Sequence, residues 1–125
     1  MSVATRKVWK PLVDTGIGVN TALAPVRLGN ISMGQYSGLK LAVSIRAKNG
    51  TSITVAVSEL LPDGTVAQIS TTTISATGSS LITIAPGIDN TAPQYNKALG
   101  NEIVIDITFT AITTIEYAVW YTLLP

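Results

Sequence analysis

The residues that could carry chemistry in this 125-residue chain are seven carboxylates and eight basic side chains, with no histidine and no cysteine. Without these two residue types the chain lacks the commonest nucleophile–base pairs and most transition-metal ligands. Neither a disulfide nor a thiolate metal site can form. Enzyme chemistry would have to rest on the carboxylates, which are scattered singly. We therefore predict a protein that is not an enzyme and that needs no cofactor.

The carboxylates bear on two kinds of site, a calcium site and a glycosidase pair. Asp63-Gly64 and Asp89-Asn90 could give oxygen ligands to calcium, but neither has the spaced run of carboxylates that a dedicated site uses. Ordinary Asx turns explain both pairs. A glycosidase would need two carboxylates facing each other across a cleft. Glu59, Asp106 and Glu116 lie on expected strands, and nothing in the sequence indicates that two of them converge.

The charge content is low for a chain of this size. Charged residues make up 12% and apolar residues 46%, whereas an ordinary soluble domain has about 25% charged residues. No apolar run approaches the roughly 20 residues of a membrane-spanning helix, and no apolar segment of a signal peptide follows the basic N-terminal residues. A net charge of +1 gives no broad footprint for nucleic acid. We expect much of the surface to be covered by other subunits. The alternative is a stable monomer whose surface is rich in Ser and Thr.

The N-terminal segment carries three of the basic residues and no acidic one: Arg6, Lys7 and Lys10. We interpret residues 1–11, which end at Pro11, as an extended arm that reaches an acidic neighbouring surface. Trp9 would be its apolar anchor. Two alternatives stay open. The segment could be a solvated terminus, or residues 8–13 could form an edge strand, where a proline is tolerated.

Two alternating stretches organise the rest of the chain. In residues 39–47 and again in 53–57, apolar residues occupy every second position, which predicts strands with one face on a core. The dipeptide Asn49-Gly50 between them suits the positive φ angles of a tight turn. These features predict a β-hairpin at the centre of the protein.

Further strands are expected over 25–32, 65–75, 81–85, 103–110 and 115–124, with a bulge or strand end after Val57. Turns are predicted at Pro62-Asp63-Gly64 and at residues 78–80, and a long loop at 87–101 could be a contact surface. About eight short strands with no helical period predict an all-β fold. We expect a single domain over 1–125, an antiparallel β-sandwich or jelly roll.

Exposed aromatic residues were considered as sugar-stacking platforms, and the candidates are Trp9, Tyr36, Tyr95 and Trp120. Aromatic residues are only 6% of the chain. Trp120 lies in the last expected strand, on the same face as Ala118 and Leu124. This face is too apolar to be fully exposed to solvent. We therefore expect Trp120 to lie in a core or an interface.

The layout of the chain resembles that of small structural proteins of tailed bacteriophages. The likeness covers roughly residues 36–123 and lies in an alternating strand, a Gly50-Thr51-Ser52 turn, the Pro62–Gly64 turn, a Pro86-Gly87 turn, and a loop at 95–100 (Tyr-Asn-Lys-Ala-Leu-Gly) before a closing strand pair. The resemblance implies a β-sandwich with a structural role as capsid cement or decoration, or as a tail component. It implies no catalytic residues.

The sequence thus predicts a virion structural protein that decorates a phage head and is assembled in the host cytoplasm. Its expected partners are the major capsid protein or other virion proteins, and copies of itself in a homo-oligomer. It is expected to bind neither nucleic acid nor membranes. The interface candidates are Arg6, Lys7, Trp9, Lys10, Tyr95 and Trp120. A tail or baseplate component and a carbohydrate-binding jelly-roll module are the alternatives.

Overall fold

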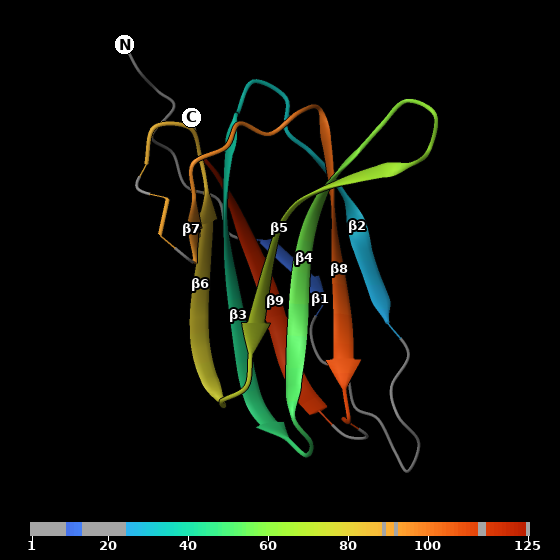
Figure 1. Ribbon diagram of the computed structural model, residues 1–125, viewed down its shortest axis with the longest axis vertical. Coiled ribbons are helices and arrows are strands. Elements are labelled where there is room, and N and C mark those ends of the chain that lie inside the picture. Colours follow the sequence, from blue (N-terminus) through green and yellow to red (C-terminus); the bar gives the residue numbers. More distant parts are fainter. Residues whose placement is uncertain (1–9, 14–24, 89, 92, 113–114, 125) are drawn as a thin grey trace.

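The computed structural model describes residues 10–13, 25–88, 90–91, 93–112 and 115–124, and every regular element in them is a β-strand. Two sheets pack against each other as layers (Figure 1). Sheet A has the order β1-β9-β3-β6-β7, and sheet B has the order β2-β8-β4-β5. The strands are β1 (Lys10–Val13), β2 (Val26–Ser32), β3 (Gly38–Lys48), β4 (Ser52–Leu60), β5 (Val66–Ile74), β6 (Gly78–Ile84), β7 (Gln94–Tyr95), β8 (Glu102–Thr110) and β9 (Ile115–Leu124).

The strand order is that of a jelly roll. The chain changes sheet at every connection except β4–β5 and β6–β7. The antiparallel pairs β1·β9, β2·β8, β3·β6 and β4·β5 nest inside one another, as in a long hairpin rolled into two sheets. The predicted all-β antiparallel sandwich of about eight strands is confirmed. The ninth strand, β7, has two residues and pairs with β6 in parallel.

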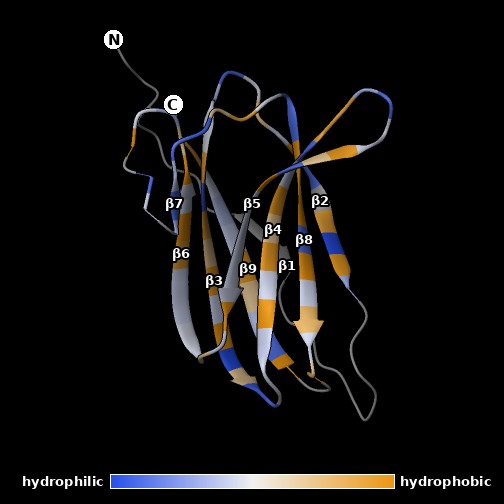
Figure 2. Ribbon diagram, viewed as in Figure 1, coloured by the Kyte–Doolittle hydropathy of each residue, from blue (hydrophilic) through white to orange (hydrophobic). Residues whose placement is uncertain are grey.

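The core lies between the sheets and is built from the alternating positions of both. Figure 2 shows strongly hydrophobic bands alternating with paler, less hydrophobic ones along β4. The side chains of Leu41 and Val43 from sheet A, and of Val55 and Ile105 from sheet B, are completely buried. Each such aliphatic side chain contributes about 1.5–3 kcal/mol on burial. The period of two therefore decides which face of each strand turns inward.

The predicted central hairpin is wrong. β3 lies in sheet A, between β9 and β6, whereas β4 lies in sheet B, between β8 and β5. The chain does reverse at Asn49-Gly50, and Gly50 has φ +97°, but the turn arches from one sheet to the other. The alternating pattern shows only that each strand has one buried face. Two strands in opposite sheets, with their buried faces toward each other, fit this pattern as well as two paired strands of a hairpin do.

The chain's true tight hairpin joins β4 to β5 at the predicted Pro62–Gly64 turn. Asp63 Oδ1 accepts hydrogen bonds from the Thr65 hydroxyl at 2.6 Å and the Thr65 backbone N–H at 3.0 Å. These bonds lower the pKa of Asp63, because they stabilise the charged carboxylate. Gly64 takes φ +88°. The Asx-turn interpretation of Asp63 is confirmed.

Two other boundary predictions have different outcomes. The predicted irregularity after Val57 is present, because the β4–β5 register shifts between Val57 and Ser58 and leaves Ile69 of β5 as the extra residue. The predicted turn at 78–80 is wrong. Gly78 begins β6, pairing with Ile45 of β3. Gly and Ser favour turns in isolation, but here the pairing with β3 extends the strand through them.

Tyr117 gives a prediction about pH. Its side chain is 3% exposed and lies edge-on to Phe109 of the opposite sheet, with ring centres 5.9 Å apart. Burial raises the pKa of Tyr117 above the ordinary value of 10.0. The unfolded chain then loses the Tyr117 proton more readily than the folded one, so this residue destabilises the fold as pH rises above 10.

We expect the free energy of unfolding of Tyr117→Phe to fall less steeply with pH, between pH 9 and 11, than that of the wild type. Urea denaturation at a series of pH values measures this. Tyr36→Phe, which removes a phenol from a half-buried position in a loop, is the matched control. Parallel wild-type and Tyr117→Phe curves would contradict the assignment.

Candidate interaction surface

The N-terminal interface candidates are placed only in part. Arg6, Lys7 and Trp9 lie outside the described residues, so their role in an arm stays a prediction. Lys10 and Pro11 belong to β1, where they pair with Tyr121 and Trp120 of β9. This part of the segment is an edge strand of sheet A, as the alternative interpretation of residues 8–13 required.

The outer face of sheet A carries a row of apolar side chains across three strands. Trp120 of β9 pairs with Ala42 of β3, and Ala42 pairs with Leu81 of β6. All three alternate with core residues, so they face away from the core. Leu81 is 52% exposed, while Trp120 and Ala42 are half-buried. We call these three residues the apolar row. On the other side of β9, Pro11 of β1 is the register partner of Trp120.

Small and polar residues surround the apolar row. Ser44 pairs with Ala118 on one side and Ser79 on the other. One end of the face has Lys40, and the other has Arg46 and Glu116, whose side chains approach to 3.5 Å. That ion pair is exposed, and such pairs contribute about 0–1 kcal/mol. An apolar centre with a polar rim is the usual anatomy of a protein–protein contact.

The outer face of sheet B is polar instead. Arg27 of β2 binds both carboxylate oxygens of Asp106 of β8, at 2.6 and 3.1 Å. This hydrogen bonding and the adjacent charge raise the pKa of Arg27. The hydroxyls of Thr54 and Thr73 lie 3.4 Å apart across β4 and β5. Among the described residues, an ion pair and threonine hydroxyls thus occupy the outer face of sheet B, whereas the apolar row crosses that of sheet A.

Tyr95 is tied into the fold. Its hydroxyl donates to the Thr71 carbonyl at 2.9 Å and lies 3.1 Å from Thr72 Oγ1. Nearby, Lys97 Nζ donates to the Ile69 carbonyl at 2.6 Å. The predicted loop over 87–101 therefore attaches to the edge of β5 through these two side chains. Tyr95 is half-buried, and its role as an interface residue stays a prediction.

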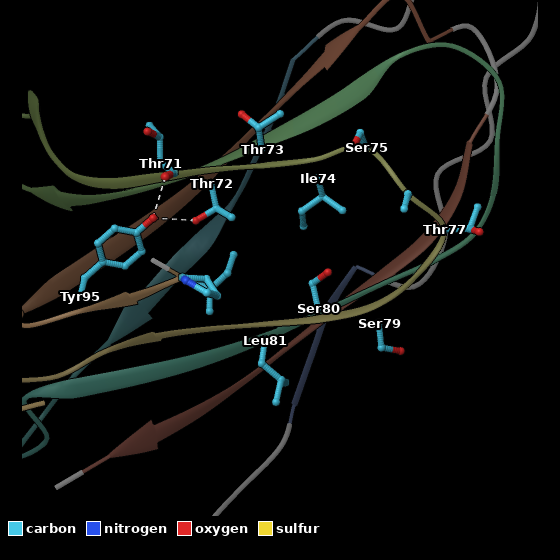
Figure 3. Close-up of a pocket in the computed structure, with 13 residues that line it drawn as sticks. Thr71, Thr72, Thr73, Ile74, Ser75, Thr77, Ser79, Ser80, Leu81 and Tyr95 are labelled. Carbon is cyan, nitrogen blue, oxygen red and sulfur yellow. Dashed lines mark hydrogen bonds between the residues drawn. The ribbon is translucent and has the colours of Figure 1, made fainter. Parts of the chain in front are cut away.

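A groove lies between β5 and β6 (Figure 3). It has a volume of about 720 Å³ and is lined largely by hydroxyl-bearing side chains of both strands, with Tyr95 and Pro93 at one end. Ile74 and Ile82, which are 7% and 1% exposed, supply its apolar part. None of the described residues that line it is charged. Sequence reasoning missed this groove, because residues 78–80 were predicted as a turn and not as part of β6, the strand that forms one wall of the groove.

The described carboxylates are dispersed. Asp106 and Glu116 lie in different sheets, and each faces an arginine. Asp89 lies outside the described residues, and Asn90 Oδ1 accepts a hydrogen bond from the Asn96 backbone at 3.3 Å. Within the described part of the chain there is no group of three or more metal-ligating side chains. No helix there is long and apolar enough to cross a membrane.

Comparison of the chain with protein-family models, with curated proteins and with solved structures finds no match.

Proposed function

We propose that this chain is a non-enzymatic structural subunit of a tailed-bacteriophage virion, a cement or decoration protein that stabilises the head through subunit–subunit contacts. The apolar row on the outer face of sheet A carries this proposal. Leu81 is 52% exposed there, and Ala42 separates it from the half-buried Trp120, in a chain with only 12% charged residues. An apolar side chain left this exposed on a sheet face is costly in water and useful in a contact.

The face suits contact with a second copy of the chain. The row is bulky at Trp120 and Leu81 and small at Ala42 between them, so a large side chain of one copy fits over the Ala42 position of another. Ser44, Ser79 and Ala118 beside the row let two sheets approach closely. Buried Trp residues are among the commonest to dominate the energy of an interface. In this proposal the copies join through sheet A, and the partner on the head is the major capsid protein.

Two alternatives lead to different results. A tail or baseplate component would use the same face in another part of the virion. A carbohydrate-binding module would use the hydroxyl-lined groove, but the phenol of Tyr95 there is already bonded to Thr71. A glycan array distinguishes this alternative, since the proposed structural role predicts no specific glycan signal.

The proposal is tested by quantitative mass spectrometry of virus particles purified on a density gradient from cells that express the gene. We expect the chain in a fixed, high copy number relative to the major capsid protein, in particles that contain heads. Its absence from intact particles would contradict the proposal. Its presence in isolated tails and not in heads would support the tail alternative.

A further inference from the structure

One edge of sheet A is open over most of β6. β3 pairs with β6 on one side from Gly78 to Ile84. On the other side, β7 pairs only with Thr83 and Ile84. Among the described residues no strand pairs with Gly78–Ile82 on that side. The groove of Figure 3 runs along this open stretch.

The backbone groups that face the groove can be assigned from the neighbouring hydrogen bonds. The Thr83 N–H donates to the Pro93 carbonyl at 3.1 Å, and the Ala85 N–H donates to the Tyr95 carbonyl at 3.0 Å. Alternation along a strand therefore turns the N–H and C=O of Ser79 and Leu81 to the same side. These groups form a continuation of the ladder that β7 begins.

The opposite wall of the groove is a second sheet edge, that of β5. Its outward carbonyls at Ile69 and Thr71 accept hydrogen bonds from the side chains of Lys97 and Tyr95. Thr73 is the next residue of the same parity, and no described strand pairs with it on this side. The groove is thus bounded by backbone edges on both walls, with Ile74 and Ile82 between them.

Other edges of the sandwich carry features that discourage strand addition. β1 contains Pro11, which has no backbone N–H, and β2 has a register shift between Leu28 and Ile31. β5 is capped by Lys97 and Tyr95. The stretch Gly78–Ile82 has no proline, no charge and no bulge in its pairing with β3.

We infer that this groove binds an extended, uncharged peptide strand from a neighbouring chain, which adds to β6 in line with β7. Strand addition is a common mode of peptide recognition in which main-chain hydrogen bonds give the affinity. The uncharged lining selects against charged side chains, because a charge placed there would be desolvated without a partner. Ile74 and Ile82 favour an aliphatic residue at an inward position. This inference does not depend on the proposed virion role.

The probe is the peptide acetyl-Thr-Ile-Thr-Val-Thr-amide, titrated into the ¹⁵N-labelled full chain to low millimolar concentration. We expect amide shift changes to be largest at Ser79, Leu81 and Thr73. The same peptide N-methylated at its three central residues cannot pair as a strand, and we expect it to bind at least tenfold more weakly. Equal binding of the two peptides, or no shift changes with the first, would overturn the inference.

Two variants test the β6 edge itself. Leu81→Pro removes the N–H that faces the groove, and proline is tolerated on the unpaired side of an edge. Leu81→Ala is the matched control, because both variants lack the leucine side chain and only Leu81→Pro also lacks the N–H. We expect Leu81→Pro to bind the peptide at least tenfold more weakly than Leu81→Ala. Equal affinities of the folded variants would contradict strand addition, and the N-methylated peptide decides the question if Leu81→Pro does not fold.

Discussion

Gly50→Ala should destabilise the domain by about 3 kcal/mol or more, among the largest effects of any single methyl group in this chain. Gly50 has φ +97°, and a Cβ at this position would overlap the Ala111 carbonyl in the β8–β9 connection. The nearby Thr51 N–H donates to the Thr110 carbonyl at 3.2 Å. The arch between the sheets would have to move away from β8, against the pairing of β4.

Gly64→Ala separates the two contributions to this effect. Gly64 has a similar φ of +88°, but a Cβ there would meet nothing within 4 Å. We expect Gly64→Ala to cost about 1–2 kcal/mol, from backbone strain alone. Denaturant unfolding of both variants measures the difference. Equal losses of stability would contradict the close packing of the arch on the β8–β9 connection.

Ala42→Glu should abolish self-association through sheet A while leaving the fold intact. Ala42 lies at the centre of the apolar row, between Trp120 and Leu81, and faces away from the core. A carboxylate there stays hydrated in a monomer, but in the contact it would be buried without a cationic partner, at a cost of several kcal/mol. We expect the dissociation constant to rise at least tenfold, and the thermal unfolding of the monomer to change little.

Thr54→Glu is the control for added charge. Thr54 is half-buried near the start of β4, on the outer face of sheet B. The Thr54→Glu variant introduces the same carboxylate on the outer face of sheet B. We expect it to leave association unchanged. If Thr54→Glu and Ala42→Glu weaken association equally, the effect comes from net charge, and the assignment to the apolar row is wrong.

The fold class could be predicted because alternation survives in almost every strand. Residues 39–45 and 53–57 bury every second side chain, and this period is incompatible with a helix. The alternation ends at the exposed Ala47, beyond a register shift with β9. The Pro62–Gly64 turn was also predictable, since the hydrogen bonds between Asp63 and Thr65 and the positive φ of Gly64 are local features. Local chemistry specified these features.

The partners of the strands could not be predicted in the same way. The Asn49-Gly50 turn has the residues of a hairpin, but the sheet to which β4 belongs depends on its pairing with β8, about fifty residues later. The groove and the apolar row also depend on strand pairing between distant parts of the sequence. Ala42, Leu81 and Trp120 become neighbours only because β9 and β6 flank β3. Trp120 was predicted as an interface residue from its own strand, whereas nothing local marks Leu81.

Sedimentation velocity of the purified full chain, from low to tens of micromolar, tests the central claim that the outer face of sheet A joins copies of this protein. We expect the wild type to sediment as an oligomer at tens of micromolar and to dissociate on dilution. Ala42→Glu should sediment as a monomer throughout, and Thr54→Glu as the wild type. A wild type that is monomeric over the whole range would contradict the claim.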